Sequence, residues 1–99
     1  MARERSIEQQ ARAFVEEGFF GVMLGIELDR VSGSALARAR SNLGQVTALR
    51  RAGRALEYDL VRARVQVSAL QSDSIEVRNE LEMSLADFKR LVGMTWIAS

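Results

Sequence analysis

The second half of the chain carries a regular apolar pattern that predicts one long helix. From Leu60 to Leu91, apolar or small residues recur in alternating steps of three and four. This spacing places them on one helical face and is typical of helices that pack along their length. We expect the helix to cover about residues 58–92, with Asp59 as its N-cap and Gly93 as its stop. The seam consists of Leu60, Ala63, Val67, Leu70, Ser74, Val77, Leu81, Ser84, Phe88 and Leu91.

The first half predicts a second long helix, over about residues 5–51, with apolar residues on more than one face. A single antiparallel partner can cover only one of these faces, and a face left in water forfeits the free energy of its burial. We therefore expect this helix to have two neighbours, and a local kink or stutter at residues 32–34, where the pattern changes phase. The three runs are Val15, Phe19, Val22 and Ile26; Phe20, Leu24, Leu28, Val31 and Ala35; and Leu36, Ala39, Leu43, Val46 and Leu49.

Residues 52–58 separate the two patterns and predict a turn. This stretch combines Gly53 with a break in the seam, and Asp59 follows as a new cap candidate. The chain contains no proline, so nothing in it forbids long helices. We expect an all-α fold, namely one antiparallel two-helix coiled-coil hairpin over residues 1–99, with a C-terminal tail at 93–99. Thirty-four positions separate Phe19 from Gly53, and 34 separate Asp59 from Gly93. At 1.5 Å per residue each of these matched arms is about 50 Å long, which describes a rod.

The apolar cluster between residues 19 and 26 is too large for one partner helix. Fully burying each large apolar side chain is worth about 1.5–3 kcal/mol, so three left in water cost roughly a small domain's stability. We expect self-association, either of hairpins side by side or of two chains that exchange arms by straightening residues 52–58. The candidate self-association residues are Phe19, Phe20, Val22, Met23, Leu24 and Ile26.

The composition removes most enzyme chemistry. The chain has no histidine and no cysteine, which excludes imidazole acid–base catalysis, thiolate nucleophiles and the common zinc and iron–sulfur ligands. Gly18, Gly21 and Gly25 interleave with large apolar residues and follow no strand, so close helix approach explains them better than a nucleotide loop. We expect no enzyme activity, no metal and no cofactor.

Charge is unevenly distributed although the formal net charge is only +1. The region around the bend is rich in arginine, and the arm that follows is richer in acids. A basic helical bend can grip phosphates, but Tyr58 is the one aromatic residue within it, which gives base stacking little support. A free-standing coiled-coil interaction protein that binds nucleic acid remains the alternative hypothesis. It rests on Arg50, Arg51, Arg54, Arg62 and Arg64.

Three motifs stand in register along the two arms. The first is the aromatic-aromatic-x-aliphatic-aliphatic run FFGVM at residues 19–23. In the second, Gly53 is followed six residues later by Asp59-Leu60 and then by Ala63-Arg64. The third is the leucine-rich stretch NELEMSLADFKRLVG at residues 79–93. Together they resemble one hairpin of the TolC-type outer-membrane efflux proteins, over residues 11–93.

The resemblance implies a part in export. Members of that family carry two such repeats with transmembrane strands, and they trimerise into a β-barrel continued by an α-helical tunnel. We therefore expect this hairpin to be a fragment of a larger protein, the tip-proximal part of a first repeat, and to form homo-oligomers (a trimer in the parent protein). The resemblance also implies that the tip meets a periplasmic adaptor (membrane fusion) protein. The tip-contact residues would be Gly53, Arg54, Ala55, Leu56 and Asp59.

The resemblance places the parent protein in the outer membrane and periplasm of a Gram-negative bacterium. The longest apolar run, residues 18–26, is far shorter than the roughly 20 residues that span a bilayer. We therefore expect the fragment itself to be soluble and to make no membrane contact. On this assignment no nucleic-acid partner is expected.

Overall fold

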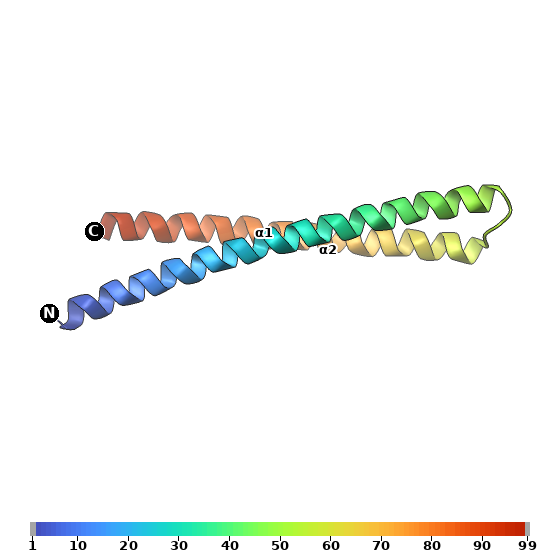
Figure 1. Cartoon of the computed structure of the whole chain (residues 1–99). Coiled ribbons are helices and arrows are strands. Elements are labelled where there is room, and N and C mark those ends of the chain that lie inside the picture. The colour runs from blue at the N-terminus through green and yellow to red at the C-terminus, as the bar shows by residue number, and fades with distance from the viewer. Residues whose placement is uncertain (1, 99) are drawn as a thin grey trace.

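The chain forms two long antiparallel helices joined by a short turn, as the computed structural model shows (Figure 1). The structure describes residues 2–98, and the side chains of residues 7–94. Helix α1 spans Ala2–Arg51 and helix α2 spans Glu57–Ala98. The hairpin is a rod with extents of 77 × 17 × 14 Å, and residues 2–98 contain no strand. The expected all-α helical hairpin is confirmed.

A glycine cap ends α1. Gly53 has a left-handed φ of 72°. Its N–H donates to the carbonyl oxygen of Arg50 at 3.0 Å, and the N–H of Arg54 donates to the carbonyl oxygen of Leu49 at 2.8 Å. This pair of bonds is a Schellman motif, which satisfies carbonyl groups that the last helical turn leaves free. Glycine is needed here because a Cβ in this conformation costs about 1–2 kcal/mol.

Asp59 caps α2, but from a different position than the sequence predicts. The helix begins at Glu57, so Leu56 is the N-cap residue and Asp59 is the third residue of the helix. The Asp59 Oδ2 accepts a hydrogen bond of 3.1 Å from the Leu56 N–H. This is the return half of a capping box, and it places a negative charge at the positive end of the helix dipole. The assignment of Asp59 as the N-cap residue is therefore wrong.

The predicted stop at Gly93 is also wrong, since α2 continues through it to Ala98. A glycine ends a helix by adopting a left-handed φ, and among the described residues only Gly53 has a positive φ. No proline follows Gly93 to prevent another helical turn. The tail expected at residues 93–99 is therefore helical as far as residue 98.

The core of the hairpin is one seam between the helices. Every α2 position that the heptad pattern selects is buried or half-buried, as the analysis of residues 60–91 predicts. The seam is closed most tightly at four residues that are 4–8% exposed, namely Val22, Ala39, Leu60 and Ala63. Two of these four are alanines, so the helices meet here mainly through small side chains.

On α1 the contact seam combines residues of two predicted apolar runs with small or polar residues that those runs did not include. The first run supplies Val15 and Val22, and the third supplies Leu36, Ala39, Leu43 and Val46. A line of buried and half-buried positions keeps alternating steps of four and three from residue 11 to residue 46, with Gly21 and Ala35 half-buried beside it, so the stutter predicted at residues 32–34 is absent. Helix α1 also continues through these residues without interruption. Five positions of this seam that lie seven residues apart all carry small residues, namely Ala11, Gly18, Gly25, Ser32 and Ala39. The full seam is Ala11, Val15, Gly18, Val22, Gly25, Asp29, Ser32, Leu36, Ala39, Leu43 and Val46.

Two of the glycines mark the closest approach of the helices. A Cβ placed on Gly18 would lie 3.0 Å from the Phe88 Cδ2, and one placed on Gly25 would lie 3.0 Å from the Leu81 Cδ1. A Cβ on Gly21 would meet nothing within 4 Å. The prediction that small residues allow close helix approach is therefore confirmed at Gly18 and Gly25 and wrong at Gly21, which faces a groove described below.

Candidate functional site

The turn brings the predicted tip residues together at one end of the rod (Figure 1). Gly53 and Asp59 have the structural roles described above, in the cap of α1 and at the start of α2. Arg54 and Leu56 are exposed, and Ala55 is half-buried. Leu56 is 69% exposed although it is apolar. The tip therefore offers an apolar side chain that the hairpin itself does not cover.

Tyr58, at the start of α2, was not among the predicted tip-contact residues. It is 70% exposed and lies two residues after Leu56. Tyrosine is one of the residues enriched among those that contribute most to protein–protein binding. The sequence carries a signal for its exposure, because Tyr58 falls outside the apolar seam of α2, but none of the three motifs specifies a residue at this position.

The tip is also cationic. The Arg50 guanidinium contacts the Glu57 carboxylate at 3.0 Å, and this ion pair links the end of α1 to the start of α2. Arg51 and Arg54 are exposed at the same end. Both side chains of the ion pair are largely exposed, so its contribution to stability is small. Its more evident effect is to fix the Arg50 side chain across the turn.

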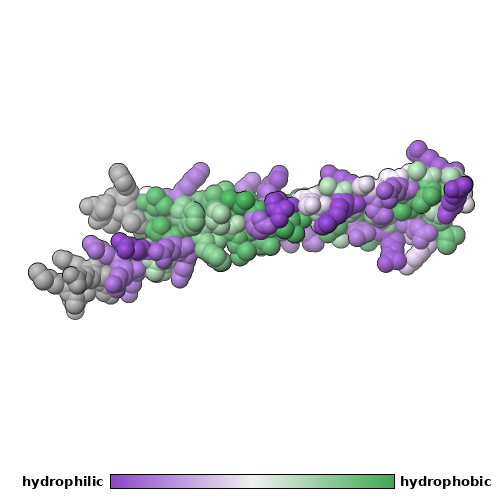
Figure 2. Space-filling view, in the orientation of Figure 1, coloured by the Kyte–Doolittle hydropathy of each residue, from purple (hydrophilic) through white to green (hydrophobic). Residues whose placement is uncertain are grey.

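Five of the six predicted self-association residues are exposed, and one is in the core. Val22 is 7% exposed because it lies in the seam against α2. The other five are 49–69% exposed on the outside of the hairpin: Phe19, Phe20, Met23, Leu24 and Ile26. The Phe19 ring is tilted by 54° against the Phe88 ring, with centroids 6.2 Å apart. Apolar surface gathers over the half of the hairpin away from the turn (Figure 2).

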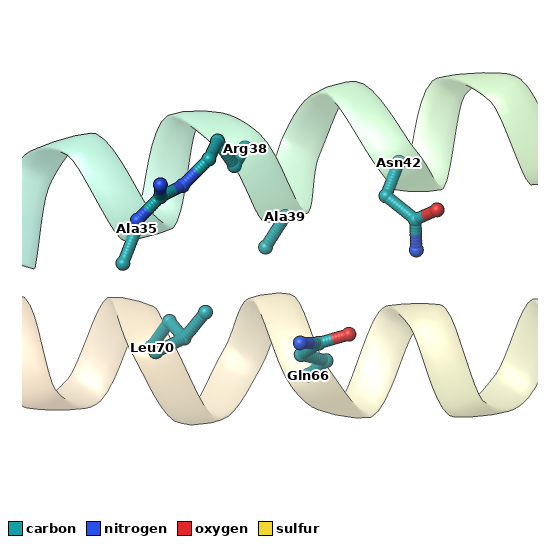
Figure 3. A pocket seen from close by; sticks show the side chains of 6 residues that line it. All are labelled: Ala35, Arg38, Ala39, Asn42, Gln66 and Leu70. Atoms are coloured by element: carbon teal, nitrogen blue, oxygen red, sulfur yellow. The ribbon is translucent and has the colours of Figure 1, made fainter.

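One lateral face of the hairpin carries a groove. Four adjoining pockets share residues with one another, Leu28 and Val77 among them, and run from Gly21 to the turn. In its middle part, Asn42 extends from α1 toward α2, where Leu70 and Gln66 form the opposite wall (Figure 3). The α1 wall comprises Gly21, Leu24, Leu28, Val31, Ala35, Arg38, Asn42 and Leu49, and the α2 wall comprises Ser84, Glu80, Val77, Glu76, Asp73, Leu70, Gln66, Arg62 and Asp59.

The half of this groove away from the turn is apolar on one wall and acidic on the other. The α1 wall there offers exposed leucines and a valine, with Leu28 46% exposed and Val31 47% exposed. The α2 wall opposite offers the carboxylates of Asp73, Glu76 and Glu80. We call this part, from Gly21 to Ala35 and from Asp73 to Ser84, the acidic groove.

The opposite lateral face is basic. Its charged residues occupy the helical positions that flank the seam on the side away from the groove, and all of them are exposed. We call this surface the basic face. Its cations are Arg12, Arg30, Arg40, Arg51, Arg64, Arg78 and Lys89, and its anions are Glu16 and Glu82.

Two ion pairs fix cations of the basic face. Arg78 on α2 contacts the Asp29 carboxylate on α1 at 3.5 Å. Arg30 donates from its Nε to the Glu27 Oε2 at 3.2 Å. This hydrogen bond, with the attraction between the two charges, lowers the pKa of Glu27 and raises the pKa of Arg30. Both arginines are 67% exposed at their side chains, so they remain available to a partner.

Among the described residues there is no helix that is long and apolar enough to cross a membrane. That part of the chain also holds no cluster of three or more metal-ligating side chains. Comparison of the chain with models of known protein families, with characterised proteins and with solved structures found no match.

Proposed function

We propose that this hairpin is a wall segment of the α-helical periplasmic tunnel of an outer-membrane export channel. One observation carries the proposal. Helix α1 has exposed apolar residues on both sides of its contact seam, with Leu24 and Leu28 toward the groove and Met23 and Ile26 toward the basic face. A helix in a closed tunnel wall has a neighbour on each side, whereas a free hairpin provides only one.

The tip supplies the second part of the proposal, which is docking to a periplasmic adaptor protein. Leu56 and Tyr58 are exposed at the end of the rod, next to arginines. The contact would serve passive transport, with no reaction at the hairpin. The parent protein would lie in the outer membrane and periplasm, with the coding sequence around this hairpin supplying transmembrane strands and a second repeat.

Tunnel-wall packing requires neighbouring hairpins to point the same way, and introduced cysteines test this. The chain has no native cysteine. Chains with Arg62→Cys, on the groove side near the turn, should form disulfides with Arg64→Cys chains, on the opposite side at the same height. They should not form disulfides with Lys89→Cys chains, whose thiol lies at the far end. Preferential pairing of Arg62→Cys with Lys89→Cys would show antiparallel neighbours and contradict the tunnel wall.

Tip docking is tested by titration with the helical hairpin of a periplasmic adaptor from the same genome. Leu56→Asp should weaken binding at least tenfold, because it places a charge on the exposed apolar contact. Aspartate is also a good N-cap residue, so the variant keeps α2 intact. The control is Val65→Asp, at a residue that is 61% exposed and lies away from the turn. Equal loss in both variants would argue against a tip contact.

The alternative function is a free-standing coiled-coil interaction protein that binds nucleic acid. The observation that favours it is the alignment of Arg40, Arg51 and Arg64 on one face near the cationic tip. Binding of this kind falls steeply with salt because each phosphate contact releases counterions. A labelled generic duplex that binds the hairpin at physiological ionic strength, and loses binding in Arg40→Gln/Arg64→Gln, would support the alternative.

A further inference from the structure

The acidic groove and the basic face lie at the same height on the rod. The contacts between Gly25 and Leu81 and between Asp29 and Arg78 fix how α1 and α2 are aligned. In this alignment Arg30 on one face is level with Glu76 on the other. Two surfaces of opposite charge therefore lie back to back on the same segment of the hairpin.

The two surfaces also have apolar residues at this height. Leu28 and Val31 line the acidic groove and are nearly half exposed. Met23 and Ile26 lie beside Arg30 on the basic face, 51% and 49% exposed. Each surface thus combines apolar side chains with charges of opposite net sign. The acidic groove carries Asp73, Glu76 and Glu80, whereas the basic face at this height carries Arg30 and Arg78 with one anion, Glu82.

We propose that the acidic groove is the docking site for the basic face of a second copy of this chain. In this contact the apolar strips of Leu28 and Ile26 cover one another, and the arginines of one copy reach the carboxylates on the α2 wall of the next. The inference rests on the side-by-side packing of the proposed function, with a second copy of this chain in the place that the second repeat would take in the parent protein, and it names the two faces that meet. It does not depend on whether neighbours point the same way or on what binds the tip.

Charge excludes the symmetric alternatives. A contact between two grooves would bring Asp73, Glu76 and Glu80 against their own copies, and a contact between two basic faces would do the same with arginines. Like charges facing each other across an interface disfavour the wrong pairing. The contact is therefore heterologous, which means that each copy keeps one free groove and one free face. Assembly continues beyond the dimer and ends in a ring or an open array.

Charge reversal tests the pairing. The groove variant is Asp73→Lys/Glu80→Lys, and the face variant is Arg30→Glu/Arg78→Glu. Each variant alone has two faces of the same sign, so its self-association should be at least tenfold weaker than that of the wild-type chain. An equal mixture of the two restores both complementary contacts and should assemble about as the wild type does. Sedimentation velocity over a concentration series measures this.

Two controls separate the specific contact from net charge and from unfolding. The quadruple variant Ser34→Lys/Ser41→Lys/Ser72→Lys/Asn79→Lys changes net charge as the groove variant does, but at exposed positions on neither face, and it should assemble normally. The second face variant, Arg30→Glu alone, keeps the ion pair of Arg78 with Asp29. Its self-association should be weakened, though less than in the first face variant, with helix content unchanged by circular dichroism.

Each outcome of the charge-reversal experiment either supports or overturns the proposed contact. Loss of assembly in both single variants with recovery in the mixture supports the proposal. A face variant that assembles like the wild type would show groove-to-groove packing and overturn it. A wild-type chain that stays monomeric at hundreds of micromolar would also overturn it, since the groove would then await a different partner. Failure of parallel orientation would refute the tunnel wall, and failure of tip docking would refute the adaptor contact. Either failure alone would leave this contact between copies standing.

Discussion

Enlarging Gly25 should separate the two helices, whereas the same change at Gly44 should not. Both glycines lie inside α1, so both carry the cost of glycine in a helix interior, about 0.5–1 kcal/mol relative to alanine. They differ in what a side chain would meet. A Cβ on Gly25 would lie 3.0 Å from the Leu81 Cδ1, and one on Gly44 would meet nothing within 4 Å.

The change in the free energy of unfolding depends on the helix-propensity gain from replacing glycine and on the steric cost of the new side chain. Gly44→Leu gains about 0.8 kcal/mol from helix propensity and has no steric cost. Gly25→Leu has the same gain, but its side chain must displace Leu81 or push α1 away from α2, and overpacking of this kind costs about 1–3 kcal/mol. The two variants should therefore differ by about 1–3 kcal/mol in the free energy of unfolding. Gly25→Ala is the intermediate case, since the Leu81 Cδ1 can move by a few tenths of an ångström.

The assay is urea unfolding followed by circular dichroism at 222 nm, at one low protein concentration for all variants. The midpoint should rise for Gly44→Leu and fall for Gly25→Leu. If Gly25→Leu is as stable as Gly44→Leu, the helices do not approach closely at Gly25, and the assignment of small residues to the contact seam is wrong. A midpoint that depends on concentration for one variant alone would reveal a change in self-association, which sedimentation measures separately.

Three further predictions concern local interactions. Gly53→Ala should lower the free energy of unfolding by about 1–2 kcal/mol, because it forces a Cβ into left-handed φ, and Gly53→Asn should lose less; thermal unfolding checks both. Asp59→Ala should cost about 0.5–2 kcal/mol, because the Leu56 N–H loses its acceptor, and Asp59→Asn should recover part of it in the same assay. The pKa of Glu27 is lowered in the fold, so the stability that its pair with Arg30 contributes is present above the unfolded pKa and is lost as pH falls through the folded one. Titration by carboxyl NMR should show the Glu27 pKa rising in Arg30→Gln, and an unchanged value would mean that the pair is absent in solution.

The fold and the α2 seam could be predicted from the sequence because they depend on strong, local signals. Large apolar residues at heptad spacing identify the buried face of α2, and Gly53 is the natural place for a left-handed turn. Asp59 and Gly93 show the limit of the same reasoning. Both residue types are common at helix ends, but their effect depends on backbone geometry, and that geometry is set by the bonds of the whole turn rather than by one residue.

The α1 seam could be predicted only in part. The apolar runs contain Val22 and Ala39, which are buried in the seam, but a pattern of apolar residues does not select Gly18 and Gly25, where the helices approach most closely. A search for small residues at every seventh position would have found this face. The acidic groove and the basic face were hidden for a related reason: they are defined by charges on both helices, and they become visible only when the alignment of α1 against α2 is known.

The small residues in the α1 contact seam also explain why the larger apolar residues beside that seam are exposed. When small residues occupy the contact line, the helices come close, and the larger residues beside that line turn outward rather than inward. Leu24, beside the contact line, is therefore 50% exposed, while Ala39, in the line, is 5% exposed. A hairpin built this way stabilises itself weakly and leaves much of its apolar surface available to neighbours. Its stability should then increase with chain concentration, because neighbouring copies supply the burial that one partner helix cannot.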